Sequence, residues 1–277
     1  MRIHTGISCI FIFFSGFVQS GSWEIEAGGF YSHTDTKINA YDPYIDRTRT
    51  IDFESDLQLE ENTVLPYVEL EYYFNQKHSV YLDWRSLHRK ATRSRLTKPF
   101  EITSDGTTYL IQVGSTVTTT LDIDLARIGY GYQFYDNNDL KIDALAGFHI
   151  MWLTFGFSGQ LGAKIEGTDQ IPSVFISDSI FSDVTAPLPN FGLQSEYTLS
   201  KDWRLISHAQ AFYLAIDDFK GWLYEIDLGV KYTFNEDLSL SGSLNYYELG
   251  VDYDDGATVV DMTYKFYGPM LTLAYEF

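Results

Sequence analysis

The last seven residues of the chain alternate between large apolar side chains and polar or small ones, and they end on an aromatic residue. Because a strand points successive side chains to opposite faces, one face of this segment would carry Leu271, Leu273, Tyr275 and Phe277. Thr272 would lie on the other face with the remaining polar and small side chains. The pattern predicts a C-terminal β-strand with one apolar face.

The same ending recurs four times inside the chain, each time directly before a short polar turn. The internal copies occupy residues 72–74, 132–134, 197–199 and 232–234. A new alternating run follows each turn, as expected of strands that reach an interface and turn back. Aromatic residues at a fixed distance from a turn are typical of a membrane-interface girdle, because amphipathic rings lie at headgroup level. We therefore interpret the repeats as one rim of a transmembrane β-barrel.

This ending resembles the C-terminal signature of Gram-negative outer-membrane β-barrel proteins of the small OmpA, OmpW and porin-like type. The resemblance implies that the final strand closes the barrel and that Leu271, Leu273, Tyr275 and Phe277 form an assembly signal. It further implies the outer membrane of a Gram-negative bacterium as location. The expected partners are the lipid bilayer, lipopolysaccharide and the barrel-assembly machinery, and a monomer is favoured.

Composition agrees with a barrel and argues against transmembrane helices. Aromatic residues make up 17% of the chain, while the mean hydropathy is slightly negative at −0.14. No internal apolar run approaches the roughly 18 residues that a membrane-spanning helix needs. Barrel strands are hydrophobic only at alternate positions, which is compatible with these values.

Residues 1–20 have the pattern of a secretory signal peptide, with Arg2 before an apolar segment and small residues near position 20. The remaining residues, 21–277, are expected to form a single domain. The only cysteine, Cys9, lies inside the leader. The mature chain would therefore have no disulfide and no cysteine metal site.

The formal net charge of −19 excludes nucleic-acid binding through phosphate neutralisation, because that mode needs many cations. Much of the acid lies in predicted loops. Acidic loops on an outer surface could bridge to lipopolysaccharide phosphates through divalent cations, but a merely solvated surface is the favoured interpretation.

The alternation predicts an all-β fold, an antiparallel up-and-down transmembrane barrel of about ten strands, with eight or twelve as alternatives. The expected strands are 23–33, 64–74, 79–92, 121–134, 140–157, 190–199, 203–215, 222–234, 238–250 and 262–277. Residues 34–62, 93–116 and 159–189 are expected to be long outer loops. Residues 52–57 alternate weakly and could extend a hairpin above the membrane. In the fourth strand the apolar parity changes, which predicts a bulge near Ala126 or a transition between loop and membrane strand.

The inward face of such a barrel would carry many charges. The expected acids are Glu24, Glu26, Glu69, Glu71, Asp83, Glu196, Glu225, Asp227 and Glu276, and the expected bases are Arg85, Arg127, Arg204 and Lys231. Charges in a poorly hydrated lumen must pair, so a network that joins the arginines to these acids is predicted. A salt-bridged plug is favoured over a narrow cation-favouring channel.

The sequence does not predict catalysis, a cofactor or a metal. No histidine is followed two residues later by serine, the pattern of small-barrel lipid A deacylases. The closest match to an omptin-like protease site pairs His208 with Asp217, but nine residues of strand span about 30 Å. The inward histidines, His149 and His208, lack a third ligand, and Asp122 with Asp124 lacks the rest of a calcium loop.

The leading hypothesis is an integral outer-membrane barrel without catalysis, either structural or a narrow passage for ions and small solutes. A surface interaction protein, which binds a ligand, host or phage through long loops, is the first alternative. A lipid-modifying enzyme or an omptin-like protease is the second.

Overall fold

The computed structural model describes residues 21–42, 46–104, 107–163, 173–254 and 259–277, and every regular element in them is a β-strand. Ten strands pair antiparallel into a closed barrel, as predicted, in the order β8-β7-β4-β3-β1-β13-β12-β11-β10-β9, and β9 pairs with β8 to complete the ring. They are β1 (Ser22–Asp42), β3 (Asn62–Asn75), β4 (His78–Arg93), β7 (Val117–Asp136), β8 (Leu140–Ala163), β9 (Ser173–Thr198), β10 (Trp203–Ile216), β11 (Phe219–Thr233), β12 (Leu238–Asp254) and β13 (Val259–Glu276). The described residues contain no helix long and apolar enough to cross a membrane. The predicted leader and Cys9 lie outside the described residues.

The four predicted turns and the C-terminal residue share one rim of the barrel. Neighbouring turns are joined by backbone hydrogen bonds, in which Gln133, Thr198, Thr233 and Glu276 donate to the carbonyls of Lys77, Asp139, Asp202 and Asp237 over 2.7–2.9 Å. Phe277 closes the ring, because its backbone N–H and C=O both bond to Trp23 at 2.8 and 2.9 Å. Short turns are characteristic of the periplasmic side, so this is the periplasmic rim.

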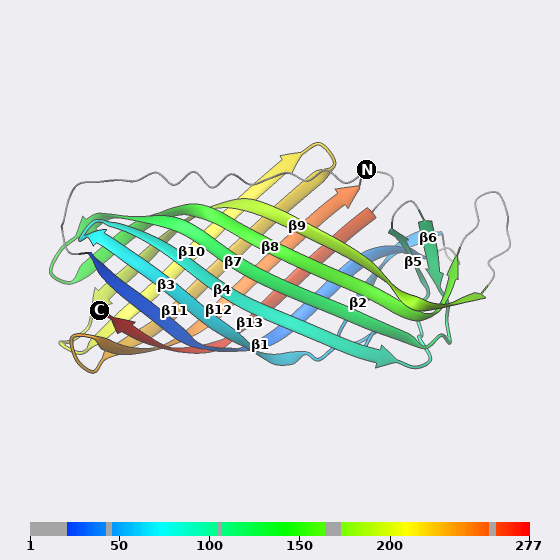
Figure 1. Cartoon of the computed structure of the whole chain (residues 1–277), viewed down its shortest axis with the longest axis horizontal. Coiled ribbons are helices and arrows are strands. Elements are labelled where there is room, and N and C mark those ends of the chain that lie inside the picture. The colour runs from blue at the N-terminus through cyan, green and yellow to red at the C-terminus, as the bar shows by residue number, and fades with distance from the viewer. Residues whose placement is uncertain (1–20, 43–45, 105–106, 164–172, 255–258) are drawn as a thin grey trace.

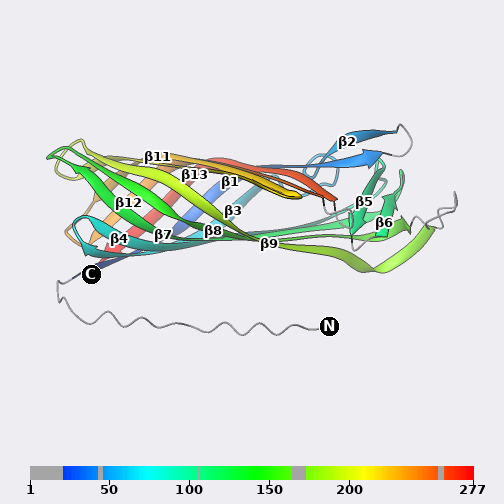
Figure 2. The same cartoon turned by 90° about the horizontal axis from the view of Figure 1, so that it is seen from above.

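Three further short strands lie at the opposite end of the barrel from the C-terminus (Figures 1 and 2). These are β2 (Arg47–Asp52), which pairs with β1, and the hairpin of β5 (Phe100–Ser104) and β6 (Thr107–Ile111), of which β6 pairs with β8. The prediction of three long outer loops was therefore wrong for most of their length. The barrel strands themselves continue outward, and residues 53–57 form a turn instead of a strand.

The change of parity in the fourth predicted strand does not come from a bulge at Ala126. The register of β7 runs without a shift through this residue, and its only shift against β8 lies at Gln133 to Tyr135. Leu121 and Leu125 face inward together with Arg127, whereas Ile128 faces outward. Apolar residues thus line the inside above Ala126 and cover the outside below it, so the polarity of the barrel reverses at this level.

The outer half of the barrel has a hydrophobic core of its own. The turn after β2 and the segment before β5 fold into the barrel mouth, where Phe53, Leu57, Leu96 and Phe100 are at most 1% exposed. The rings of Phe53 and Phe100 lie 6.1 and 5.8 Å from Phe157 on β8. The outer parts of the barrel strands have no lipid-facing band. Burial of apolar side chains inside the barrel stabilises them, as it does in a soluble protein.

The inner half presents its apolar side chains to the exterior instead. Exposed aliphatic residues such as Leu82, Leu193 and Leu228 form a band on the outer wall. Exposed aromatic side chains border the band at two levels. Trp23, Phe74, Phe134, Trp203, Phe234 and Phe277 lie near the periplasmic rim, and Tyr31, Trp84, Trp152, Tyr213, Tyr246 and Tyr267 lie toward the outer half. This is the surface that a bilayer covers.

The barrel lumen as candidate functional site

Four charged side chains form a neutral cluster across the middle of the lumen, and each is between 1% and 4% exposed. Glu225 on β11 accepts from Arg85 Nη2 at 2.9 Å through Oε1 and from Arg127 Nη1 at 2.7 Å through Oε2. Arg127 also contacts Asp83 through its Nε. Two acids therefore balance two bases, which is the condition under which buried charges are tolerated. We call these four residues the mid-lumen cluster.

Polar and aromatic side chains enclose the mid-lumen cluster. Gln210 Oε1 accepts from Asn190 Nδ2 at 2.5 Å and faces Arg127 Nη1 at 3.5 Å. The guanidinium of Arg85 lies 5.4 Å from the ring of Tyr67, close enough for a cation–π contact. Gly129 on the neighbouring strand leaves room for Tyr81, because a Cβ there would lie 2.4 Å from the Tyr81 ring.

A second group of charges lies nearer the periplasmic rim. Lys231 Nζ is 3.7 Å from carboxylate oxygens of both Glu24 and Glu196. Arg204 lies 3.9 Å from Glu196 and donates to Thr233 Oγ1 at 3.3 Å. The prediction joined Arg204 to Arg85 and Arg127 in one network, whereas the structure places it in this separate group.

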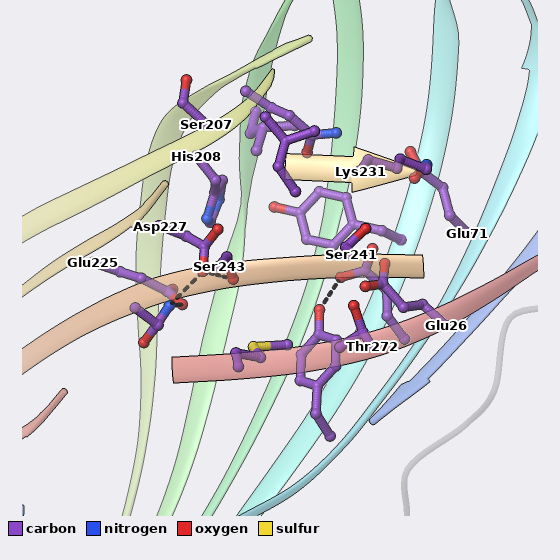
Figure 3. Close-up of a pocket in the computed structure, with 18 of the residues that line it drawn as sticks. Glu26, Glu71, Ser207, His208, Glu225, Asp227, Lys231, Ser241, Ser243 and Thr272 are labelled. Atoms are coloured by element: carbon purple, nitrogen blue, oxygen red, sulfur yellow. Dashed lines mark hydrogen bonds between the residues drawn. The ribbon is translucent and has the colours of Figure 1, made fainter. Parts of the chain in front are cut away.

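Acidic side chains dominate one wall of the lumen between these two groups. The backbone register places Glu24 opposite Glu71 and Glu26 opposite Glu69 on the paired strands β1 and β3. Glu69 and Glu71 accept hydrogen bonds from tyrosine hydroxyls at 2.6 and 2.7 Å. Asp227 lies on the far wall and accepts from Ser243 at 2.8 Å. Figure 3 shows Glu26 and Glu71 across the cavity from His208 and Asp227.

The space between these walls is a small cavity of about 140 Å³. It is lined by both charge groups and by polar residues of β10 and β12. The mid-lumen cluster and then the apolar core lie on its outer side. The described residues thus form an acidic cavity on the periplasmic side of the mid-lumen cluster, which we call the acidic vestibule.

The two inward histidines have different partners. His149 is 1% exposed and its Nε2 lies 3.3 Å from the hydroxyl of Tyr247. His208 lines the cavity and pairs in register with Asp227. Asp217 lies in the turn between β10 and β11, far along the strand from His208, which agrees with the separation expected from the sequence. Asp124 faces outward and contacts His88 at 3.1 Å.

Sequence reasoning missed Arg89, which anchors the segment that folds into the barrel mouth. Its guanidinium pairs with Glu54, donates to Thr36 Oγ1 at 2.6 Å and bonds the carbonyl of Glu60 at 3.1 Å. Burial raises the pKa of the nearby Tyr264 phenol, so this ring stays neutral beside the cation. The signal was present in the sequence, because Arg89 continues the inward parity of Asp83 and Arg85.

Replacing Arg89 with methionine is expected to release residues 53–60 from the barrel mouth, because Glu54 would remain buried without a cation. Removal of one partner of a buried ion pair costs about 3–5 kcal/mol. Hydrogen exchange by mass spectrometry should show faster exchange in residues 53–60 and unchanged exchange in β10 to β12. Lys90→Met is the matched control, since Lys90 is exposed on the same strand. Equal protection in the two variants would contradict the anchoring role.

One group of carboxylates outside the lumen has metal-like spacing. Oxygens of Asp35, Asp52 and Glu54 lie within 4.8 Å of one another. Lys37 Nζ contacts Asp35 at 2.7 Å, and Arg89 contacts Glu54. Side-chain cations therefore already neutralise much of this group.

The residues of the predicted assembly signal all lie on the outer face of β13. Leu271, Leu273, Tyr275 and Phe277 are 47–64% exposed, and the ring of Tyr275 stacks on that of Phe277 at 5.9 Å. The strand pairs with β1 on one side and β12 on the other. The terminal strand thus closes the barrel, while its recognition by assembly machinery stays a prediction.

Comparison with solved structures shows the same fold in an outer-membrane barrel. The outer membrane protease OmpT from Escherichia coli aligns with a TM-score of 0.55 at 10% identity, over 95% of this chain and 98% of that chain. Lower TM-scores of 0.36 relate the chain to Ail of Yersinia pestis, at 10% identity over 93% and 99% of the two chains, and to the outer membrane protein AlkL, at 12% identity over 98% and 97%. At identities this low, the similarity shows a common fold and says nothing of a common function. The closed barrel with its lipid-facing band has the fold of the outer-membrane β-barrel OmpT.

Sequence comparison gives the family. No curated protein sequence matches the chain. The sequence pattern of one family matches residues 115–277, which is more than half of the chain and includes β7 to β13. The chain therefore belongs to the family described as "Protein of unknown function, DUF481".

Proposed function

We propose that this protein is a non-catalytic structural barrel that does not conduct, and that it holds a folded head on the cell surface. The observation that carries the proposal is the double closure of the lumen. The side chains of the mid-lumen cluster are at most 4% exposed at one level, and the side chains of the apolar core are buried above it. An ion would have to cross both layers, and each strongly disfavours a hydrated charge.

Single-channel recording in a planar bilayer tests this proposal. The wild-type protein is expected to give no conductance steps over a wide range of salt and voltage, while a general porin inserted in the same preparation gives regular steps. Regular steps from the wild-type protein would overturn the closed-lumen proposal in favour of a narrow passage.

The absence of catalysis is part of the proposal and needs its own measurement. Lipid A mass spectra and peptide cleavage by intact cells should be identical with and without the protein. A difference that depends on the protein would favour the enzyme alternative.

A surface interaction function is the second candidate, and the folded outer half favours it. Outward strand extensions packed on a hydrophobic core form a rigid platform, which binds partners at a lower entropic cost than flexible loops. We further propose lipopolysaccharide and the barrel-assembly machinery as partners, and a monomeric state. A light-scattering mass above that of one chain after subtraction of detergent would contradict the last point.

A further inference from the structure

The lipid-facing wall of the barrel carries a depression. It has a volume of about 560 Å³ and lies over β1, β12 and β13, with the edge of β3. Its lining is mostly apolar or small and includes Gly29, Tyr31, Val64, Gly242, Pro269 and Leu271. We call this depression the wall groove.

Small residues and an interrupted ladder produce the wall groove. The pairing of β1 with β13 is continuous as far as Phe30 with Met270, and it resumes at His33 with Tyr267. Gly268, in the interruption, has φ +155°, and a Cβ there would lie 2.1 Å from a backbone oxygen of Tyr31. Pro269 next to it has no N–H to donate. Gly29 and Gly242, which line the groove, have no side chain to fill it.

The floor of the wall groove is thin. Ser243 and Met270 line the groove on the lipid side, and both also line the cavity in the lumen. Ser243 and Met270 therefore lie between the hydrocarbon and the acidic vestibule. An unfilled groove would leave them without packing partners on one side.

The wall groove lies in the outer half of the membrane. A tilted strand crosses the bilayer in about ten residues, and the periplasmic end of β13 is marked by Phe277. Leu271 lies six residues from that end and Tyr267, an exposed aromatic of the outer level, lies ten. The groove reaches from Gly242 and Leu271 up to Tyr31 and Val64, which places it toward the outer leaflet.

We propose that the wall groove binds an acyl chain of a lipid A molecule in the outer leaflet. The groove is continuous with the surface that contacts the bilayer, and its apolar lining suits a hydrocarbon chain. Lipid A is the source because the groove lies at the depth of the outer leaflet. The bound chain packs over Ser243 and Met270 and seals the wall at its thinnest point. The inference deepens the partnership with lipopolysaccharide in the proposed function and rests on it, whereas the closed lumen is tested separately by the conductance measurement.

Filling the groove from the protein side tests the proposal. A side chain at Gly242 has space, because a Cβ there meets nothing closer than Leu271 Cδ1 at 3.9 Å. Gly242→Leu should therefore fold normally and occupy the site of the acyl chain. Ala209→Leu is the control, since Ala209 is exposed on the outer face of β10, away from the groove. Gly29→Val fills the groove from the opposite wall, where the nearest atom to a Cβ lies 3.4 Å away.

Native mass spectrometry of the full chain, extracted from outer membranes in mild detergent, measures the bound lipid. We expect one retained lipid A on the wild type and on Ala209→Leu, and about tenfold lower occupancy on Gly242→Leu and Gly29→Val, because lost methylene burial weakens binding by such factors. Delipidated protein should regain the adduct with purified lipid A and not with phosphatidylethanolamine. Equal occupancy in all variants, no retained lipid on the wild type, or rebinding of the phospholipid alone would each overturn the proposal.

Discussion

Replacing Glu225 with glutamine is expected to lower the free energy of unfolding by about 3–5 kcal/mol, the usual cost of removing one partner from a buried ion pair. Glu225 is 1% exposed and bonds both Arg85 and Arg127. The amide would leave two guanidinium groups with one carboxylate, that of Asp83. Urea unfolding in lipid vesicles, followed by tryptophan fluorescence, measures the loss.

A double variant separates charge imbalance from lost packing. Glu225→Gln combined with Arg85→Met restores neutrality, because Arg127 keeps Asp83 as its partner. The double variant should therefore be more stable than Glu225→Gln alone. Glu236→Gln serves as the control, since Glu236 is exposed in a periplasmic turn. If Glu225→Gln matches this control, the mid-lumen cluster is not a stabilising unit.

Replacing Phe277 with aspartate is expected to reduce the amount of assembled protein in the outer membrane about tenfold or more. An aromatic side chain that is buried against a binding partner, here the assembly machinery, contributes several kcal/mol to recognition. Phe277 is 64% exposed on the lipid face and makes its closing hydrogen bonds through the backbone. Glu276→Gln changes a neighbouring residue and should assemble normally. Heat-modifiable migration of membrane fractions on gels measures the assembled amount.

Refolding of the purified Phe277→Asp protein in detergent distinguishes assembly from stability. The backbone bonds to Trp23 remain available in the variant, so refolding should reach nearly the wild-type yield. Normal levels in the membrane would contradict an assembly signal. Poor refolding in detergent would assign the residue a structural role instead.

The inner half of the barrel could be predicted because the bilayer imposes a simple rule on every strand. Leu228 and Tyr275 face lipid, and their neighbours in sequence face the lumen, so a period of two gives the strand, its face and the rim. The inward charges of the mid-lumen cluster followed from the same parity. Which acid meets which base did not, because Arg85 and Arg127 reach Glu225 across 140 and 98 residues of chain.

The outer half could not be predicted with the same rule. Above Ala126 the apolar side chains face inward. Leu121 and Ile123 therefore lie on the opposite face of the strand from the apolar residues below Ala126, and alternation alone did not distinguish a bulge from a change of surroundings. Phe53 lies in a turn and Leu96 in the irregular segment before β5, and both enter the core without any periodic pattern. The group that Arg204 joins depends on its height along the barrel axis relative to the other inward charges. The alternation pattern gives the face on which a side chain lies, but it does not give this height.

The reversal of polarity along β7 limits how the length of this chain can change. One residue inserted into β7 would exchange the two faces on one side of the insertion, so Arg127 would face hydrocarbon or Leu121 would face water. Two inserted residues would keep both faces but move every hydrogen-bond partner by one pair. Insertions and deletions are therefore tolerated in the turns and hairpin tips. Within each long strand, the number of residues in the segment that faces lipid and in the segment that faces water is fixed.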